Sequence, residues 1–328
     1  MKPSVPRQII KNNILNLVLI LFASVLFALS FPNLVTAQGI PFLAWVSYVP
    51  VFFLISRISI GASVFWGALY GYTAYGLFNY WLSVFHPLAG LIVGCIYLTY
   101  FALLFPFLKL AEKLFPQKYY LVQWLLWLAY EYLRTQGFLG YAYGITGYSQ
   151  WEILPLIQIA SLFGVWGVSA LVVFPSAYIA RWLVFIQQNR TKHYVQFIKQ
   201  EWLPLSLWII ALFTSLIYGY NAQVSYKDAP VARLALIQHN SDPWRGGIAA
   251  YRQNFTTLKR LSLEAVSQEK KPDLVVWSET AFVPRIYWHK TYRDDPESYE
   301  LVKDLLEFLA TQDIPYVIGN DDGRKEIT

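Results

Sequence analysis

Long apolar stretches in the first 220 residues constrain this fold more than any other feature of the sequence. They lie at about 13–30, 39–56, 60–82, 88–108, 119–135, 161–186 and 203–220. A helix needs about 20 mostly apolar residues to cross a bilayer, and each stretch is close to that length. The sequence therefore predicts a membrane domain of about seven helices over residues 1–220, followed by a polar domain over residues 221–328.

The stretch 137–160 interrupts this pattern. It holds Gly137, Gly140, Gly144, Gly147 and Pro155 among aromatic residues. Irregular backbone at membrane depth is tolerated only where protein surrounds it or where it lines a water-filled cavity. We expect an interfacial or re-entrant segment here rather than another span.

Charge is distributed unevenly along the chain. Residues 1–220 carry 12 Lys/Arg and 4 Asp/Glu, a net charge of +8, whereas residues 221–328 carry 14 and 16, a net charge of −2. The basic loops follow alternate spans, which predicts a cytoplasmic N-terminus and, after seven spans, a polar domain outside. In a bacterium this means a multi-pass protein of the inner membrane with a periplasmic C-terminal domain. The polar domain has no basic stripe, so we exclude nucleic acid as a partner.

Cysteine and histidine are too few for a metal site or a disulfide framework. Cys95 is the single cysteine and lies in an apolar run, and His86, His193, His239 and His289 show no ligand spacing. We expect no metal and no cofactor, and we interpret Cys95 as a small packing residue.

The polar domain has the pattern of an α/β fold. Strands are predicted at 231–238, 274–277 and 316–318, and amphipathic helices at 248–267 and 299–311. Alternating strands and helices predict parallel pairing. Three strands in about 100 residues do not make a complete two-faced α/β domain, so we expect an incomplete one.

Glu279 is the strongest catalytic candidate because it follows the apolar 274–277 strand directly. Open α/β sheets place their chemistry outside the carboxyl ends of strands. A carboxylate there would be partly desolvated and is a plausible general base, while a surface glutamate in a loop is the structural alternative. The sequence Gly319-Asn-Asp-Asp-Gly323 lacks the remaining ligands of a calcium loop and is interpreted as a turn.

Two further patterns predict packing within the membrane domain. Glu131 and Arg134 lie three residues apart near a helix end, which predicts an ion pair. Gly67 with Gly71, and Gly90 with Gly94, have the spacing of small residues at helix–helix interfaces.

Motifs in a fixed order along the chain resemble those of one protein family. They are Leu29-Ser-Phe-Pro32 with Trp45 through Pro50, Gly71 through Trp81, Glu131-Tyr-Leu-Arg134, Gly147-Tyr-Ser-Gln150, Gly164-Val-Trp-Gly-Val-Ser169, Gln238-His-Asn240 with Trp244, and Val276-Trp-Ser-Glu-Thr-Ala281. Each motif alone is weak. Their joint order over residues 29–284 resembles the bacterial apolipoprotein N-acyltransferases, which join a bundle of spans to a nitrilase-like carbon–nitrogen hydrolase domain.

The resemblance implies a multi-span helical bundle followed by the start of a nitrilase-like α-β-β-α sandwich outside the cytoplasm. It implies an N-acyltransferase that uses a Glu-Lys-Cys triad and a thioester intermediate, with Glu279 as the base. Trp244 occupies the family's tryptophan position and would shape the substrate-binding cleft, while packing of a loop is the structural alternative. The partners would be a phospholipid acyl donor, a diacylated apolipoprotein acceptor and membrane lipids.

The chain departs from the family pattern after Glu279. The family's lysine and cysteine lie downstream of the glutamate segment, Cys95 lies in an early span, and Lys270, Lys290, Lys303 and Lys325 are not in the lysine's context. We therefore expect a fragment, a truncated product or one part of a split enzyme whose other chain completes the catalytic domain. Alone, this chain is expected to be inactive, and the alternative is a non-catalytic membrane protein that binds lipid or a partner.

Overall fold

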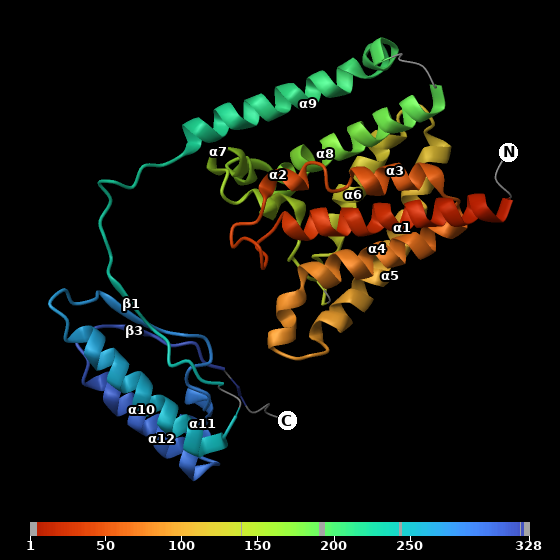
Figure 1. Cartoon of the computed structure of the whole chain (residues 1–328). Helices are drawn as coiled ribbons and strands as arrows, with labels where there is room; N and C mark the ends of the chain where they lie inside the picture. The colour runs from red at the N-terminus through yellow and green to blue at the C-terminus, as the bar shows by residue number, and fades with distance from the viewer. Residues whose placement is uncertain (1–4, 139, 190–193, 243–244, 322, 325–328) are drawn as a thin grey trace. The chain divides into compact units, whose positions relative to one another are not determined.

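The computed structural model describes residues 5–138, 140–189, 194–242, 245–321 and 323–324 (Figure 1). The chain divides into two compact units, Met1–Val224 and Ser225–Thr328. We call them unit 1, which is helical, and unit 2, which is α/β.

Unit 1 is built from helices of very different lengths. They are α1 (Val5–Leu29), α2 (Pro41–Ala44), α3 (Val49–Arg57), α4 (Ile60–Phe78), α5 (Ala89–Leu114), α6 (Tyr119–Leu133), α7 (Leu154–Ile157), α8 (Ala160–Asn189) and α9 (Tyr194–Ala222), with short 3-10 helices η1 (Tyr80–Val84) and η2 (Thr146–Gln150). Within the described residues, four helices are long and apolar enough to cross a membrane: Gln8–Leu29, Ala89–Leu114, Ala160–Gln188 and Val195–Ala222. The chain is thus a multi-pass membrane protein.

The other three predicted spans coincide with shorter or less apolar helices. The range 39–56 is divided between α2 and α3, 60–82 contains the 19-residue α4, and 119–135 contains the 15-residue α6. Whether these three helices cross the bilayer stays a prediction. The described part of 137–160 contains η2, α7 and the irregular backbone around them, as the glycine-rich sequence predicts.

Helices α4 and α5 pack at very short distance through glycine. A Cβ atom on Gly67 would overlap the carbonyl oxygen of Phe101, and one on Gly71 would overlap that of Tyr97. The predicted small-residue packing is therefore confirmed for this pair. The prediction that Cys95 packs against a neighbour is wrong, because Cys95 is exposed while Tyr97, two residues further along α5, is buried.

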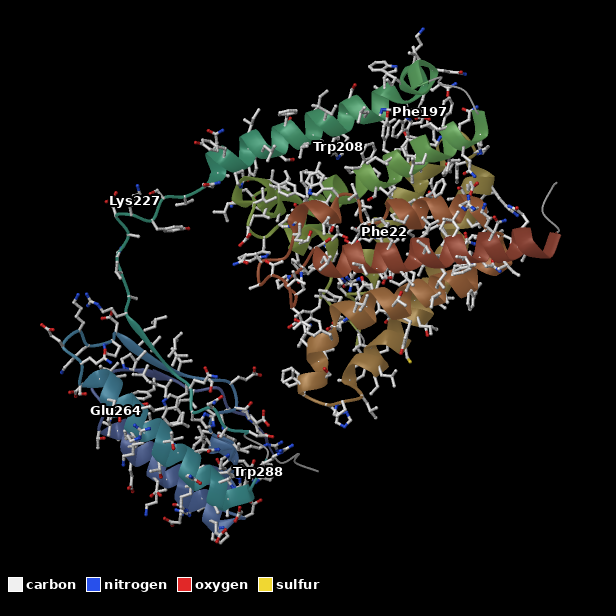
Figure 2. The ribbon with its side chains drawn as sticks, in the orientation of Figure 1. Phe22, Phe197, Trp208, Lys227, Glu264 and Trp288 are labelled. Atoms are coloured by element: carbon white, nitrogen blue, oxygen red, sulfur yellow. The ribbon has the colours of Figure 1, made fainter. Side chains whose placement is uncertain are left out.

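Apolar side chains cover the outside of unit 1 as well as filling its interior. Phe22 of α1 is exposed, whereas Trp208 of α9 packs toward α8 (Figure 2). The Nε1 of Trp208 donates a hydrogen bond to the carbonyl of Leu171 at 2.9 Å, and its ring stacks on Phe174. An apolar exterior fits a lipid environment, where tails are as apolar as the side chains that face them.

Unit 2 is a parallel sheet with helices packed against it (Figure 1). Its elements are β1 (Leu234–Ile237), α10 (Gly247–Val266), β2 (Leu274–Trp277), α11 (Ile286–Tyr292), α12 (Pro296–Ala310) and β3 (Tyr316–Val317). The strand order is β1-β2-β3, with Leu236 opposite Val276 and Val275 opposite Tyr316. The predicted strand–helix order and parallel pairing are confirmed, while α11 was not expected.

The core of unit 2 lies on one face of this sheet. Val275 and Trp277 of β2 are buried with Leu258 of α10 and Leu301 of α12. Successive strand residues point to opposite faces, so the intervening residues turn the other way. On that second face Leu234, Leu236 and Val317 are exposed, so the sheet presents apolar side chains that the described residues leave uncovered.

Candidate functional site

The chain turns sharply after β2 and carries Glu279 in that turn. The backbone N–H of Ser278 donates to the carbonyl of Ile237 at 3.2 Å, which continues the pairing with β1 by one residue. Thr280 then has a φ of 56°, and the N–H of Ala281 donates back to the Ser278 carbonyl at 3.2 Å. The turn therefore delivers Glu279 at the carboxyl ends of β1 and β2.

A pocket of about 300 Å³ surrounds this position. It is lined by residues from the turns after β1 and β2: Gln238, His239, Asn240, Ser241, Asp242, Ser278 and Glu279. Glu279 itself is exposed, so the partial desolvation expected from its place after an apolar strand is not found. The reason is that the carboxylate has already left the buried strand when the chain turns.

His239 is the unexpected member of this pocket. Both ring nitrogens are buried, and neither has a hydrogen-bond partner among the described residues. Desolvation lowers the pKa of His239 below its usual value, so the neutral ring is favoured near pH 7. Its sequence spacing gave no metal signal, and only the pairing of β1 with β2 brings it beside Glu279.

The segment after β3, which contains Gly319 and Asn320, packs against the loop that carries Glu279 and bonds to the residues that follow it. A Cβ atom on Gly319 would lie 3.6 Å from the Cα of Glu279. The side chain of Asn320 donates from Nδ2 to the carbonyls of Phe282 and Pro284 at 2.9 and 3.0 Å, and its Oδ1 accepts from the N–H of Ile286 at 2.8 Å. The expected turn is not found in the described residues 319–321 and 323; Asn320 instead fixes the chain that follows Glu279.

The other residues considered from the sequence do not enter this pocket. Trp244 and Lys325 lie outside the described residues. Lys270, Lys290 and Lys303 do not line the pocket, and Lys303 pairs with Glu300 at 3.7 Å. Nowhere in the described ranges do three or more His, Cys, Asp or Glu side chains gather as a metal site would require.

A larger hollow of unit 2 is not the candidate site. It measures about 1000 Å³ and is lined by α10 and α12 residues such as Arg252, Lys259, Asp304 and Glu307. Arg252 and Asp304 form an exposed ion pair across it at 3.8 Å. We interpret this hollow as a solvated groove between two helices. Exposed ion pairs of this kind contribute little to stability, and no strand end lines the groove.

Unit 1 contains a second candidate site, an apolar pocket of about 830 Å³, which we call the aromatic pocket. It is formed by the turn after α1, the end of α4 with η1, and the segment 142–151. Its lining includes Phe31, Phe78, Trp81, Tyr143, Tyr148 and Trp151. A pocket of this size and polarity fits an apolar ligand.

Glu131 and Arg134 hold the segment that lines the aromatic pocket. Glu131 Oε1 accepts from the N–H of Thr146 at 3.0 Å and from its hydroxyl. Arg134 Nη1 donates to the carbonyls of Tyr141 and Tyr143, both at 2.9 Å. The predicted Glu131–Arg134 ion pair is wrong: irregular buried backbone needs polar partners, and these two side chains supply them instead of pairing with each other.

Motifs far apart in the sequence meet at this segment. The N–H of Gly147 donates to the hydroxyl of Ser169 at 2.9 Å, and the hydroxyls of Tyr48 and Thr146 lie 2.6 Å apart. The Nε1 of Trp45 donates to Gln150 at 3.0 Å. The glycine-rich segment is therefore fixed to α6, to α8 and to the chain between α2 and α3.

Comparisons with known proteins identify relatives along most of the chain. Residues 23–178 match the family described as "Apolipoprotein N-acyltransferase N-terminal domain". The chain is 43% identical over 312 residues to "Apolipoprotein N-acyltransferase 1" of Treponema denticola and 42% identical over 317 residues to "Apolipoprotein N-acyltransferase 1" of Treponema pallidum, in each case across 94% of its length. It is 28% identical over 313 residues to "Apolipoprotein N-acyltransferase" of Borreliella burgdorferi. The chain spans 57% and 58% of the two Treponema proteins and 56% of the Borreliella protein.

Proposed function

Because the chain belongs to the apolipoprotein N-acyltransferase family, whose N-terminal portion it matches, we propose that it supplies the membrane domain and the general base of an N-acyltransferase. The enzyme would move an acyl chain from a phospholipid to the N-terminal diacylglyceryl-cysteine of an apolipoprotein. The observation that carries this proposal is the position of Glu279, in a pocket at the carboxyl ends of β1 and β2.

In the proposed reaction Glu279 accepts and returns a proton in both steps, the formation of the thioester and its aminolysis. It takes the proton of a cysteine thiol as the sulfur attacks the phospholipid ester, and it returns that proton to the departing lysophospholipid alcohol. It then takes a proton from the α-amino group of the acceptor, whose nitrogen attacks the thioester, and gives it to the sulfur. A covalent thioester lets two large lipids use one site in turn, and a lysine would stabilise the oxyanions.

We assign the nucleophile and the lysine to no residue of this chain. Cys95 belongs to helix α5 of unit 1, and the described lysines of unit 2 do not line the Glu279 pocket. We propose that polypeptide beyond these 328 residues supplies both groups, as a continuation of this chain or as a separate chain.

The aromatic pocket of unit 1 is the proposed place for the acyl chains. Its apolar lining and its volume of about 830 Å³ suit hydrocarbon. The basic loops support a cytoplasmic N-terminus in a bacterial inner membrane and a periplasmic unit 2.

The test is Glu279→Gln in a complete protein that contains this chain and the cysteine and lysine segments. Removing a general base should lower the turnover of a diacylated lipopeptide by about 100-fold or more. Glu269→Gln is the matched control, since Glu269 is an exposed glutamate of unit 2 that does not line the pocket. Substantial turnover by the Glu279 variant would remove this residue from the base role.

A further inference from the structure

A polar pocket of about 480 Å³ lies where α1, α3 and α8 converge, remote from the aromatic pocket. We call it the Arg57 pocket. Its polar lining consists of Asn12, Asn16, Ser56, Arg57, Gln187 and Gln188. Along α1, the 13 residues from Asn16 to Leu29, the end of the helix just before Phe31, correspond to about 20 Å of helix, so the two pockets occupy different levels of unit 1.

Two polar groups in the Arg57 pocket are buried without a partner. Asn16 is 5% exposed, and its Oδ1 has no hydrogen-bond partner within the described chain; the same is true of Arg57 Nε. Native proteins satisfy nearly all buried polar groups with protein or ordered water. An unpartnered acceptor and an unpartnered donor in one pocket indicate a ligand that offers both functions.

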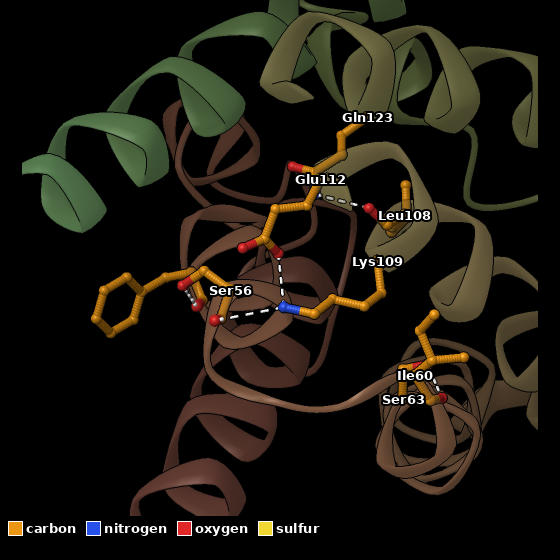
Figure 3. Close-up of polar contacts among 8 residues, drawn as sticks. Ser56, Ile60, Ser63, Leu108, Lys109, Glu112 and Gln123 are labelled. Carbon is orange, nitrogen blue, oxygen red and sulfur yellow. Dashed lines mark hydrogen bonds and ion pairs between the residues drawn. The ribbon is translucent and has the colours of Figure 1, made fainter. Parts of the chain in front are cut away.

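Arg57 also lacks the carboxylate that its neighbouring cations have. Lys109 Nζ lies 2.7 Å from Glu112 Oε2 and 3.4 Å from the carbonyl of Ser56 (Figure 3). Arg181 Nε lies 3.8 Å from Glu201 Oε1. Throughout the described ranges no carboxylate lies within 4 Å of Arg57, and its Cζ lies 5.6 Å from the centroid of the Phe53 ring.

This charge pattern selects the kind of ligand. No carboxylate lines the pocket, so a metal cation has no anionic ligand and faces the guanidinium. The volume is many times the roughly 30 Å³ of one water molecule. An anion with further polar groups fits the guanidinium and the four carboxamides.

The surroundings of the pocket favour a lipid as the source of this anion. Ile9, Ile10 and Ile14 of α1 and Ile186 of α8 are exposed apolar side chains beside the polar lining. Asn12, Gln187 and Gln188 are themselves exposed, so the pocket opens to the outside of the bundle. Basic pockets between membrane helices are known binding places for anionic headgroups.

We infer that the Arg57 pocket binds the headgroup of an anionic glycerophospholipid that carries a free hydroxyl, of the phosphatidylglycerol class. The phosphate accepts hydrogen bonds from Arg57 and from the carboxamide N–H groups of Asn12, Gln187 and Gln188, and the headgroup hydroxyl donates to Asn16 Oδ1. The acyl chains lie along the exposed isoleucines. This site is independent of the proposed acyl transfer.

The test is native mass spectrometry of the full 328-residue chain in a phospholipid-free detergent, titrated with phosphatidylglycerol and with phosphatidylmethanol, which has the same charge and no hydroxyl. Arg57→Gln should raise the Kd for phosphatidylglycerol at least tenfold. Lys113→Gln removes an exposed charge outside the pocket and should change it less than twofold. Asn16→Leu should weaken phosphatidylglycerol at least threefold and leave phosphatidylmethanol unchanged.

A second measurement uses only the wild-type chain, so its result does not depend on how the variants fold. It should bind phosphatidylglycerol at least threefold more tightly than phosphatidylmethanol. Inorganic phosphate at about 10 mM, a concentration that would saturate a site with a Kd of about 1 mM, should not displace the lipid. Displacement by phosphate would identify a site for a soluble anion and overturn the lipid assignment. Equal losses in Arg57→Gln and Lys113→Gln, or equal affinity for the two lipids, would also overturn it.

Discussion

Thr146 and Glu131 are joined twice, because both the backbone N–H and the hydroxyl of Thr146 donate to the same carboxylate oxygen of Glu131. Glu131 belongs to α6, and Thr146 to the irregular segment that lines the aromatic pocket. The other carboxylate oxygen of Glu131 is buried without a hydrogen-bond partner in the part of the chain that the structure describes. The position of the segment therefore depends strongly on Thr146.

Thr146→Val keeps the shape of this side chain and removes its hydroxyl. We expect the free energy of unfolding to fall by about 1–3 kcal/mol, since a buried carboxylate and the Tyr48 hydroxyl both lose a partner. The measurement is thermal denaturation in detergent. Thr99→Val is the control: Thr99 is exposed, and we expect a change within about 0.5 kcal/mol. Equal shifts in the two variants would contradict the role given to Thr146.

Gly71→Ala should weaken the contact between α4 and α5. The new Cβ would overlap the carbonyl of Tyr97, so the helices must separate, at a cost of about 1–3 kcal/mol. Gly76→Ala, in the same helix, meets no atom within 4 Å and should leave stability unchanged or raise it by up to about 1 kcal/mol. Denaturation midpoints of the two variants measure the difference. Equal changes of the midpoint in the two variants would contradict the close contact assigned to Gly71.

The stability of unit 2 should fall as the pH drops below about 6.5. Burial lowers the pKa of His239 in the folded state, so the unfolded chain binds more protons between the folded and unfolded pKa values. The contribution is complete above the unfolded pKa and is lost as the pH falls through the folded one. Hydrogen exchange of β1 amides at pH 7 and pH 5 would measure it, and His239→Gln should reduce the difference. Asp295, whose pKa is lowered by its bond to Ser298, gives a contribution that is complete above its ordinary pKa of about 3.9 and is lost only as the pH falls further.

The purified 328-residue chain should not acylate a diacylated lipopeptide in phospholipid vesicles. Its one thiol, Cys95, is on α5 in unit 1, and thioester formation needs a thiol beside the base. Product formation would be followed by mass spectrometry of the lipopeptide. Turnover that disappears in Cys95→Ala would make Cys95 the nucleophile and contradict our assignment.

The sequence predicts those parts of the fold that depend on local pattern. Apolar stretches, strand alternation and strand–helix order located the helices and the parallel sheet, because these signals lie within about 20 residues. The pairing of β1 with β2 brings His239 to Glu279, and no local signal contains that information. Glu131 and Arg134 show the same limit. Their spacing suggests an ion pair, but both side chains form hydrogen bonds with the backbone of residues 141–146 instead, and the spacing does not encode the path of that backbone.

The Asn320 bonds to Phe282, Pro284 and Ile286 set an order of events during synthesis. Asn320 follows Glu279 by 41 residues, so a ribosome adding about 5–20 residues per second makes it roughly 2–8 s later. During that interval the turn that carries Glu279 has its strands β1 and β2 but lacks its later support. The support that Asn320 gives to the chain after Glu279 therefore cannot form until β3 has been synthesised, so the candidate base gains this support later than it gains β1 and β2.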